Sequence, residues 1–168
     1  MVFALGATQA FAAPFSIDAV KAAYLFRFAS YVQWPQSIQN EGPFLIGVVG
    51  ADDVAVHLER LLTGMSVQGR TAQVRRVRTP DDLAGLHILY VGPNVFRSAR
   101  ALRLRAIEKP ILLVTDADDG IAGGAVINFI EANRNLRFEI SLDAADRSGL
   151  KIDSALLSVA ARVDARTQ

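Results

Sequence analysis

The chain has 168 residues, of which 51% are hydrophobic and 21% are charged. This length fits a single domain, and this hydrophobic content supports a folded core rather than an intrinsically disordered chain. The 18 basic and 17 acidic side chains leave a net charge of +1, so the basic excess typical of a nucleic-acid-binding protein is missing.

The first 13 residues, MVFALGATQAFAA, are small and apolar and end in the A-x-A-like pattern Ala10-Phe11-Ala12. This pattern is typical of the end of a secretory signal peptide. The basic segment that normally opens a signal peptide is missing, because the first basic residue is Lys21. We interpret residues 1–13 as a signal-peptide remnant and expect export; a short buried N-terminal segment is the alternative interpretation.

A helix is expected to begin after Ser16, which suits the N-cap, and to continue to about Val32. Its apolar residues recur at spacings of three and four, which predicts one buried stripe formed by Ile17, Val20, Tyr24, Phe28 and Tyr31. Phe26 falls on the opposite side of this helix.

Strands and helices then alternate along the chain. Short apolar runs predict buried strands at 44–50, 87–91 and 111–115. Val74 and Val77 alternate with arginines, which predicts a more exposed strand at 72–77. Helices are expected at 52–63, from Thr79 and from Asn94. Two further strands, 125–130 and 136–141, suggest an antiparallel hairpin, which a helix from Ser154 follows. The pattern predicts an α/β fold: one layered domain over residues 16–163, with a mostly parallel sheet flanked by helices and a C-terminal antiparallel hairpin.

Asp116 and Asp118 follow the strand predicted at 111–115, and ligands of open α/β sheets gather at such strand ends. Together with Gly123 and Gly124 they form a candidate site for a small ligand; a solvated turn is the alternative. A calcium loop starting at Asp116 would need a carboxylate at its twelfth position, where the chain has Ile127. No metal site is therefore predicted.

Catalytic patterns are missing from the sequence. The two histidines, His57 and His87, have no nearby pattern of a nucleophile and a base, and each is expected to be structural. The glycines build no phosphate-binding loop, and the absence of cysteine excludes thiol chemistry and cysteine-ligated metals. We predict a protein without enzymatic activity and without a cofactor.

Recognition residues are the better candidates. Tyrosine, tryptophan and arginine are enriched at binding hot spots. We select two groups as candidate partner-binding residues, which are Phe26, Tyr31 and Trp34 from the first helix and its end, and Arg97, Arg100 and Leu104 from the helix expected after Asn94. An ordinary core and a solvated basic face are the alternatives. A homodimer is a further interpretation, because Phe26 and Leu104 lack an obvious place in the core.

Several segments, taken in order, resemble one known family. They are KAAYLFRFASYVQWP (Lys21–Pro35), FLIGVVGADD (Phe44–Asp53), SVQGRTAQVRRV followed by LHILYVG (Ser66–Gly92), and the C-terminal GG-A-VINF, NRNLRFEISL, A-A-DRSGLKI and S-ALLSVA. The chain is similar in these segments to the YfiR-like (YfiR/HmsC-like) proteins, which are small periplasmic repressors of membrane-bound diguanylate cyclases.

This resemblance implies a function that the residues alone would not indicate. It implies a periplasmic protein that binds the periplasmic sensor region of an inner-membrane diguanylate cyclase and represses it, which would lower cyclic di-GMP and biofilm formation. In some relatives an outer-membrane lipoprotein relieves the repression, so such a lipoprotein is a further expected partner. The alternative function is that of a periplasmic small-ligand-binding protein.

Overall fold

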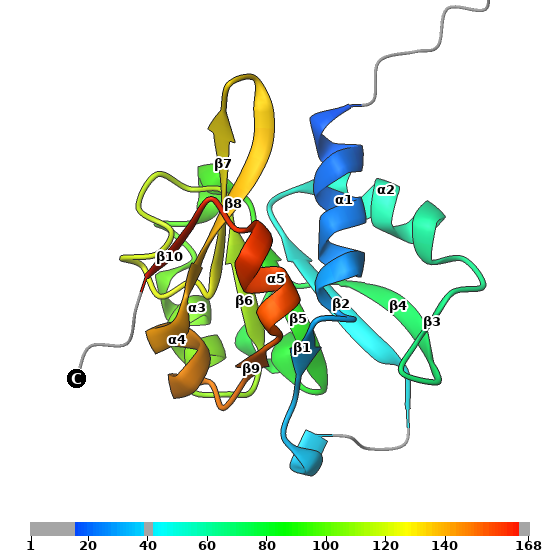
Figure 1. Cartoon of the computed structure of the whole chain (residues 1–168). Coiled ribbons are helices and arrows are strands. Elements are labelled where there is room, and N and C mark those ends of the chain that lie inside the picture. The colour runs from blue at the N-terminus through cyan, green and yellow to red at the C-terminus, as the bar shows by residue number, and fades with distance from the viewer. Residues whose placement is uncertain (1–15, 39–41, 165–168) are drawn as a thin grey trace, which may run out of the picture.

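The structure is a computed structural model that describes residues 16–38 and 42–164. The interpretation of residues 1–13 as a signal-peptide remnant lies outside the described residues. Figure 1 shows a central twisted sheet with helices packed on both of its faces, and a two-stranded ribbon beside it.

The main sheet has eight strands in the order β10-β8-β7-β6-β5-β2-β4-β3. Their bounds are β2 Phe44–Val49, β3 Ser66–Val67, β4 Arg70–Arg76, β5 Leu86–Val91, β6 Leu112–Thr115, β7 Ile127–Ala132, β8 Asn135–Ser141 and β10 Arg162–Asp164. The central strands β4, β2, β5, β6 and β7 run parallel, while β7 and β8 form an antiparallel hairpin. The predicted fold class, a mostly parallel sheet with a C-terminal hairpin, is confirmed.

The helices divide between the two faces of the sheet. One buried cluster joins the sheet to α1 (Ile17–Phe28), α2 (Asp52–Leu62), α4 (Leu142–Arg147) and α5 (Ser154–Val159). A second cluster joins the other face to α3 (Arg100–Ile107) and to residues of the 3₁₀ turns η2 (Pro80–Leu83) and η3 (Pro93–Val95). Neighbouring residues of a strand fall in different clusters, as Phe44 and Leu45 do, because side chains alternate across a sheet.

Helix α1 begins as predicted but differs in its end and its buried face. The Ser16 hydroxyl accepts a hydrogen bond from the Ala19 amide at 3.1 Å, which confirms the N-cap. The helix ends at Phe28 rather than near Val32, because Val32 pairs with Ile152 in the ribbon of β1 (Val32–Gln33) and β9 (Lys151–Ile152).

The predicted apolar stripe of α1 was wrong in part. The fully buried residues of the helix are Ala22, Leu25 and Phe28, whereas Ile17 is 49% exposed. Since this helix packs both on the sheet and beside α2, more than one of its sides is covered, and a single stripe does not describe it.

Helix α3 also differs from prediction. Helix α3 begins at Arg100 and Asn94 is not its cap, because residues 93–95 form a separate 3₁₀ turn. Arg103 is buried on the inner side of α3, since its guanidinium lies 3.9 Å above the Phe96 ring.

Candidate functional site

The usual ligand position of an open parallel sheet is filled with protein atoms here. The strand order reverses between β2 and β5, and ligands commonly bind at the carboxyl ends of such strands. A Cβ at Gly50 would overlap Val95, and a Cβ at Gly92 would lie 2.5 Å from the Gly50 carbonyl oxygen. The chain segments that leave these two strands therefore pack directly against each other.

A polar hollow lies further along the same edge of the sheet, and we call it the Asp116 hollow. It has a volume of about 680 Å³, and Asp116 and Asp118 both line it, together with Lys21 and Asn128. Lys21 Nζ lies 2.6 Å from Asp116 Oδ2, and the Tyr90 hydroxyl donates to Asp116 Oδ1 at 2.7 Å. Burial, followed by the charge of Asp116, raises the pKa of Tyr90, so this hydroxyl keeps its proton.

Gly123 and Gly124, the other two residues of the predicted ligand site, lie in the loop before β7 and shape it. A Cβ at Gly123 would lie 2.5 Å from the Phe96 ring, and the Gly123 carbonyl accepts a hydrogen bond from Arg103 at 2.6 Å. Gly124 has a φ of +96°, which a glycine adopts without strain. The structure therefore brings Asp116 and Asp118 together but leaves Gly123 and Gly124 outside the lining of the hollow.

A groove of about 400 Å³ lies between α1 and α5, and we call it the aromatic groove. Its lining consists of Tyr24, Arg27, Phe28, Tyr31, Phe138, Ala155, Leu156, Ser158 and Val159. The rings of Tyr24, Phe28, Phe129 and Phe138 pack beneath it with centroids 5.3 to 5.9 Å apart. The floor is apolar, and Val159, at the rim of the groove, is 56% exposed.

The six residues predicted to bind a partner do not form one surface. Phe26 and Tyr31 are half-buried against the cluster beneath α1, while Leu104, 44% exposed, lies on α3 at the other face of the sheet. Arg97 and Arg100 are exposed near Leu104, and Arg97 lies 3.5 Å from Asp119. A single flat partner could not contact both groups.

Trp34 is buried, with 5% of its surface exposed. Its indole N–H donates to the His87 carbonyl at 3.1 Å, and its ring meets the Phe44 ring edge-on at 5.3 Å. In the folded chain Trp34 therefore packs in the core, and its side chain presents little surface to a partner.

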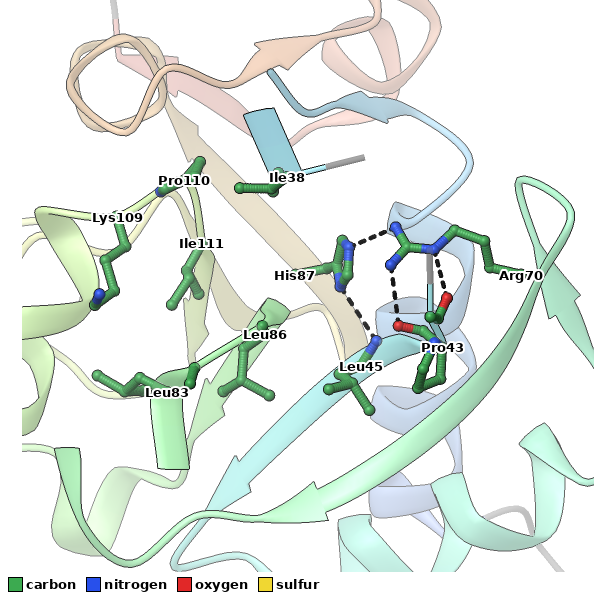
Figure 2. A pocket seen from close by; sticks show the side chains of 13 residues that line it. Ile38, Pro43, Leu45, Arg70, Leu83, Leu86, His87, Lys109, Pro110 and Ile111 are labelled. Carbon is green, nitrogen blue, oxygen red and sulfur yellow. Dashed lines mark hydrogen bonds between the residues drawn. The ribbon is translucent and has the colours of Figure 1, made fainter. Parts of the chain in front are cut away.

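An apolar slot lies at the opposite edge of the sheet, where the parallel strands begin (Figure 2). We call it the Arg70–His87 slot. The buried His87 ring stacks on Phe44 at 4.3 Å, and its Nε2 lies 2.8 Å from Arg70 Nη1. The Leu45 amide donates to Nδ1 of the same ring at 3.2 Å.

Both ring nitrogens of His87 thus face hydrogen-bond donors, and the neutral ring, which carries one N–H, accepts at only one of them. A doubly protonated imidazolium has no acceptor, so these contacts oppose protonation. Burial, and then the positive charge of Arg70, lower the pKa of His87 from 6.5 to about 4, against the opposite effect of the Ile38 carbonyl. His87 is therefore neutral at pH 7.

The sequence did not predict this slot as a site. Arg70 stood among basic residues that resemble a solvated face, and His87 opened an apolar strand and had no chemical partner nearby in the chain. The two residues meet because β4 and β5 both flank β2, a non-local pairing that leaves no signal in the local sequence.

Comparisons with known proteins identify the family to which the chain is similar. The family described as YfiR/HmsC-like matches residues 18–161. A solved structure described as a conserved domain protein from Vibrio cholerae O1 biovar eltor str. N16961 is similar with a TM-score of 0.49 and 16% identity, over 71% of this chain. The chain spans 54% of the length of that protein, and a comparison with curated proteins gives no match. Among the helices of residues 16–38 and 42–164, none is long and apolar enough to cross a membrane.

Proposed function

The chain belongs to the YfiR/HmsC-like family, whose members are periplasmic regulators of diguanylate cyclases, and we propose on this basis that it represses one such cyclase. It binds the periplasmic sensor region of an inner-membrane diguanylate cyclase and holds the enzyme inactive. The family match over residues 18–161 is the observation that carries this proposal, because it covers the whole described domain apart from a few terminal residues.

The aromatic groove supports the proposal as the docking surface. Its occupant is a segment of the cyclase sensor region that carries apolar side chains next to an acidic one. The apolar side chains fit the ring-lined floor, and the acidic group faces Arg27, which lines the groove and forms no ion pair with another described residue. Aromatic floors of this kind are typical of binding hot spots.

The repression follows from a difference in affinity. A repressor that binds the inactive conformation of the cyclase more tightly than the active one shifts the enzyme toward the inactive state. A shift from mostly active to mostly inactive needs a preference of roughly 10²- to 10⁴-fold, or about 3–5 kcal/mol. Two large apolar side chains that enter the groove only in the inactive conformation would each contribute about 1.5–3 kcal/mol to this preference, which is enough.

Two matched surface substitutions test the docking surface. Val159 and Leu104 are both exposed aliphatic residues, at 56% and 44%, and they lie on opposite faces of the sheet. Deletion of the gene in its host should raise cyclic di-GMP, and the wild-type chain and Leu104→Asp should both restore repression. Val159→Asp should not, because an aspartate at the groove rim would weaken binding by about 30-fold or more.

The possible outcomes test the repressor function and the position of the docking surface separately. Unchanged cyclic di-GMP after deletion, in cells where the cyclase is expressed and active, would refute the repressor function. Failure of Leu104→Asp with full activity of Val159→Asp would instead move the docking surface to α3. Circular dichroism of both variants checks that each remains folded. N-terminal sequencing of protein from a periplasmic extract tests the export that the function requires.

Binding of a small ligand at the Asp116 hollow is the second candidate function, and one observation favours it. Asn128 is 4% exposed and lines the hollow, and its Oδ1 has no hydrogen-bond partner among the described residues. Buried polar groups are normally paired, so an unpaired amide oxygen in the wall of the hollow is unusual for a purely structural residue. A saturable thermal shift with one member of a metabolite panel, lost in Asn128→Leu, would support it.

A further inference from the structure

The Arg70–His87 slot is an apolar cavity with a positive charge at one end. Its volume is about 380 Å³, within the range of small-ligand sites, which are mostly apolar with a few polar groups. Figure 2 shows Leu83, Leu86 and Ile111 grouped along the slot, with Arg70 and His87 on one side and Lys109 on the other.

The guanidinium of Arg70 has no counter-charge among the described residues. Its Nε donates to the Gly42 carbonyl at 2.8 Å, its Nη2 to the Pro43 carbonyl at 3.1 Å, and its Nη1 lies 2.8 Å from His87 Nε2. The two carbonyls are neutral, and so is His87 at pH 7, since its pKa lies near 4. A guanidinium carries five N–H groups, so at least two of them remain without a described acceptor.

The other described residues of the slot add positive charge and no negative charge. Its described lining residues include Lys109 at the rim and no aspartate or glutamate. Lys109 is exposed and forms no ion pair with a described residue. A half-buried guanidinium without a counter-charge keeps an unfavourable desolvation cost, which a bound anion would offset.

We propose that the Arg70–His87 slot binds a small monocarboxylate with an apolar body. The carboxylate accepts hydrogen bonds from the remaining N–H groups of Arg70, and Lys109, on the other side of the slot, adds a second positive charge at the rim. The apolar body lies along Leu83, Leu86 and Ile111. This site does not depend on the proposed repression of a cyclase, because it lies at the opposite end of the sheet strands from the Asp116 hollow and uses no residue of the aromatic groove.

A purely structural role for Arg70 is the competing explanation. Its bonds to the Gly42 and Pro43 carbonyls fix the entry to β2, and such a role requires no ligand. The two explanations differ in their predictions for added anions, because only a ligand site would bind them saturably and according to the length of their apolar part.

In the experiment the full chain is titrated with four probes, and binding is measured by calorimetry and by NMR of the imidazole groups. Octanoate and 3-phenylpropionate carry both features and distinguish an alkyl from an aryl body. Acetate lacks the apolar body, and octyltrimethylammonium carries the opposite charge. The chain has two histidines, so His57, which lies on α2 and does not line the slot, is an internal control for His87.

We expect saturable binding of octanoate or 3-phenylpropionate, with the His87 resonances shifting and those of His57 unchanged. Acetate and octyltrimethylammonium should each bind at least about 10-fold more weakly, since a charge-assisted hydrogen bond or the burial of several methylene groups accounts for such a factor. Equal binding of octyltrimethylammonium, equal binding of acetate, or no shift of His87 with either carboxylate would each overturn the proposal.

Three variants locate the site. Arg70→Gln should weaken carboxylate binding by about 10- to 100-fold, and Lys109→Gln by about threefold because it is exposed. Ala84→Phe fills the slot from an exposed position and should abolish binding with the fold intact, so it remains informative if Arg70→Gln disturbs the entry to β2. Full binding by Ala84→Phe would show that the carboxylate binds elsewhere.

Discussion

The buried histidine of the Arg70–His87 slot predicts a specific loss of stability in mild acid. In the folded chain burial and Arg70 hold the pKa of His87 near 4, whereas in the unfolded chain it returns to about 6.5. Above pH 6.5 both states are neutral at this residue and the contribution to stability is complete. Between pH 6.5 and 4 only the unfolded chain binds the proton, so the free energy of unfolding falls as the pH falls.

The size of this effect follows from the two pKa values. A difference between about 6.5 and about 4 corresponds to about 3 kcal/mol of stability, which is a large part of the 5–15 kcal/mol of a typical domain. Below pH 4 His87 is protonated in both states, so its contribution no longer changes. Carboxylates also titrate in this range, so the contribution of His87 must be obtained from a comparison with a variant.

This effect is measured by urea unfolding at several pH values between 7 and 4. Unfolding is monitored by the fluorescence of Trp34, which is buried and is the single tryptophan of the chain. His87→Gln keeps an acceptor near Arg70 but has no titrating group. We expect this variant to be less stable than the wild type at pH 7 and to lose about 3 kcal/mol less between pH 7 and pH 4. In Arg70→Gln the pKa of His87 should rise only part of the way to 6.5, because burial is the larger cause.

Two results would refute this reasoning. One is a parallel loss of stability in the wild type and His87→Gln between pH 7 and pH 4. The other is an NMR titration in which the His87 imidazole of the folded protein has a midpoint near 6.5.

Three further substitutions test the packing by urea unfolding at pH 7. Gly50→Ala places a Cβ against Val95 at a φ of +60°, so it should cost about 3 kcal/mol, and a second change of Val95 to alanine should recover only the part due to overlap. Phe129→Ala should cost about 3–5 kcal/mol, and a loss below 1 kcal/mol would contradict its place in the aromatic cluster. Asp116→Asn removes the carboxylate 2.6 Å from Lys21 and leaves only Asp18, 3.8 Å away, so it should cost about 2–3 kcal/mol, whereas unchanged stability would show that the pair adds nothing.

The buried strands were predictable because consecutive apolar residues indicate a strand that is covered on both faces. A strand covered on both faces of a parallel sheet is apolar at every position, and β2 and β5 carry such runs. The hairpin of β7 and β8 was also predictable, since its strands are neighbours in the chain. The end of α1 was not, because it depends on the pairing of Val32 with Ile152, which lies 120 residues further on in the sequence.

The candidate sites were less predictable, because they depend on contacts between residues that are far apart in the sequence. Arg97 and Leu104 were partner-binding candidates together with Phe26, but the sequence could not show that the two groups lie on opposite faces of the sheet. Arg103 resembled a solvated residue of a basic helix, yet it is buried because its guanidinium lies on the Phe96 ring and donates to two carbonyls.

The sequence by itself determined the fold class, the family and the order of the strands along the chain, because periodicity and apolar runs record which residues avoid water. Only the tertiary structure decided which charged groups are buried together. The neighbours of His87, Arg70 and Asp116 come from strands and helices far apart in the chain, and the electrostatic state of a buried group depends on those neighbours rather than on its own segment.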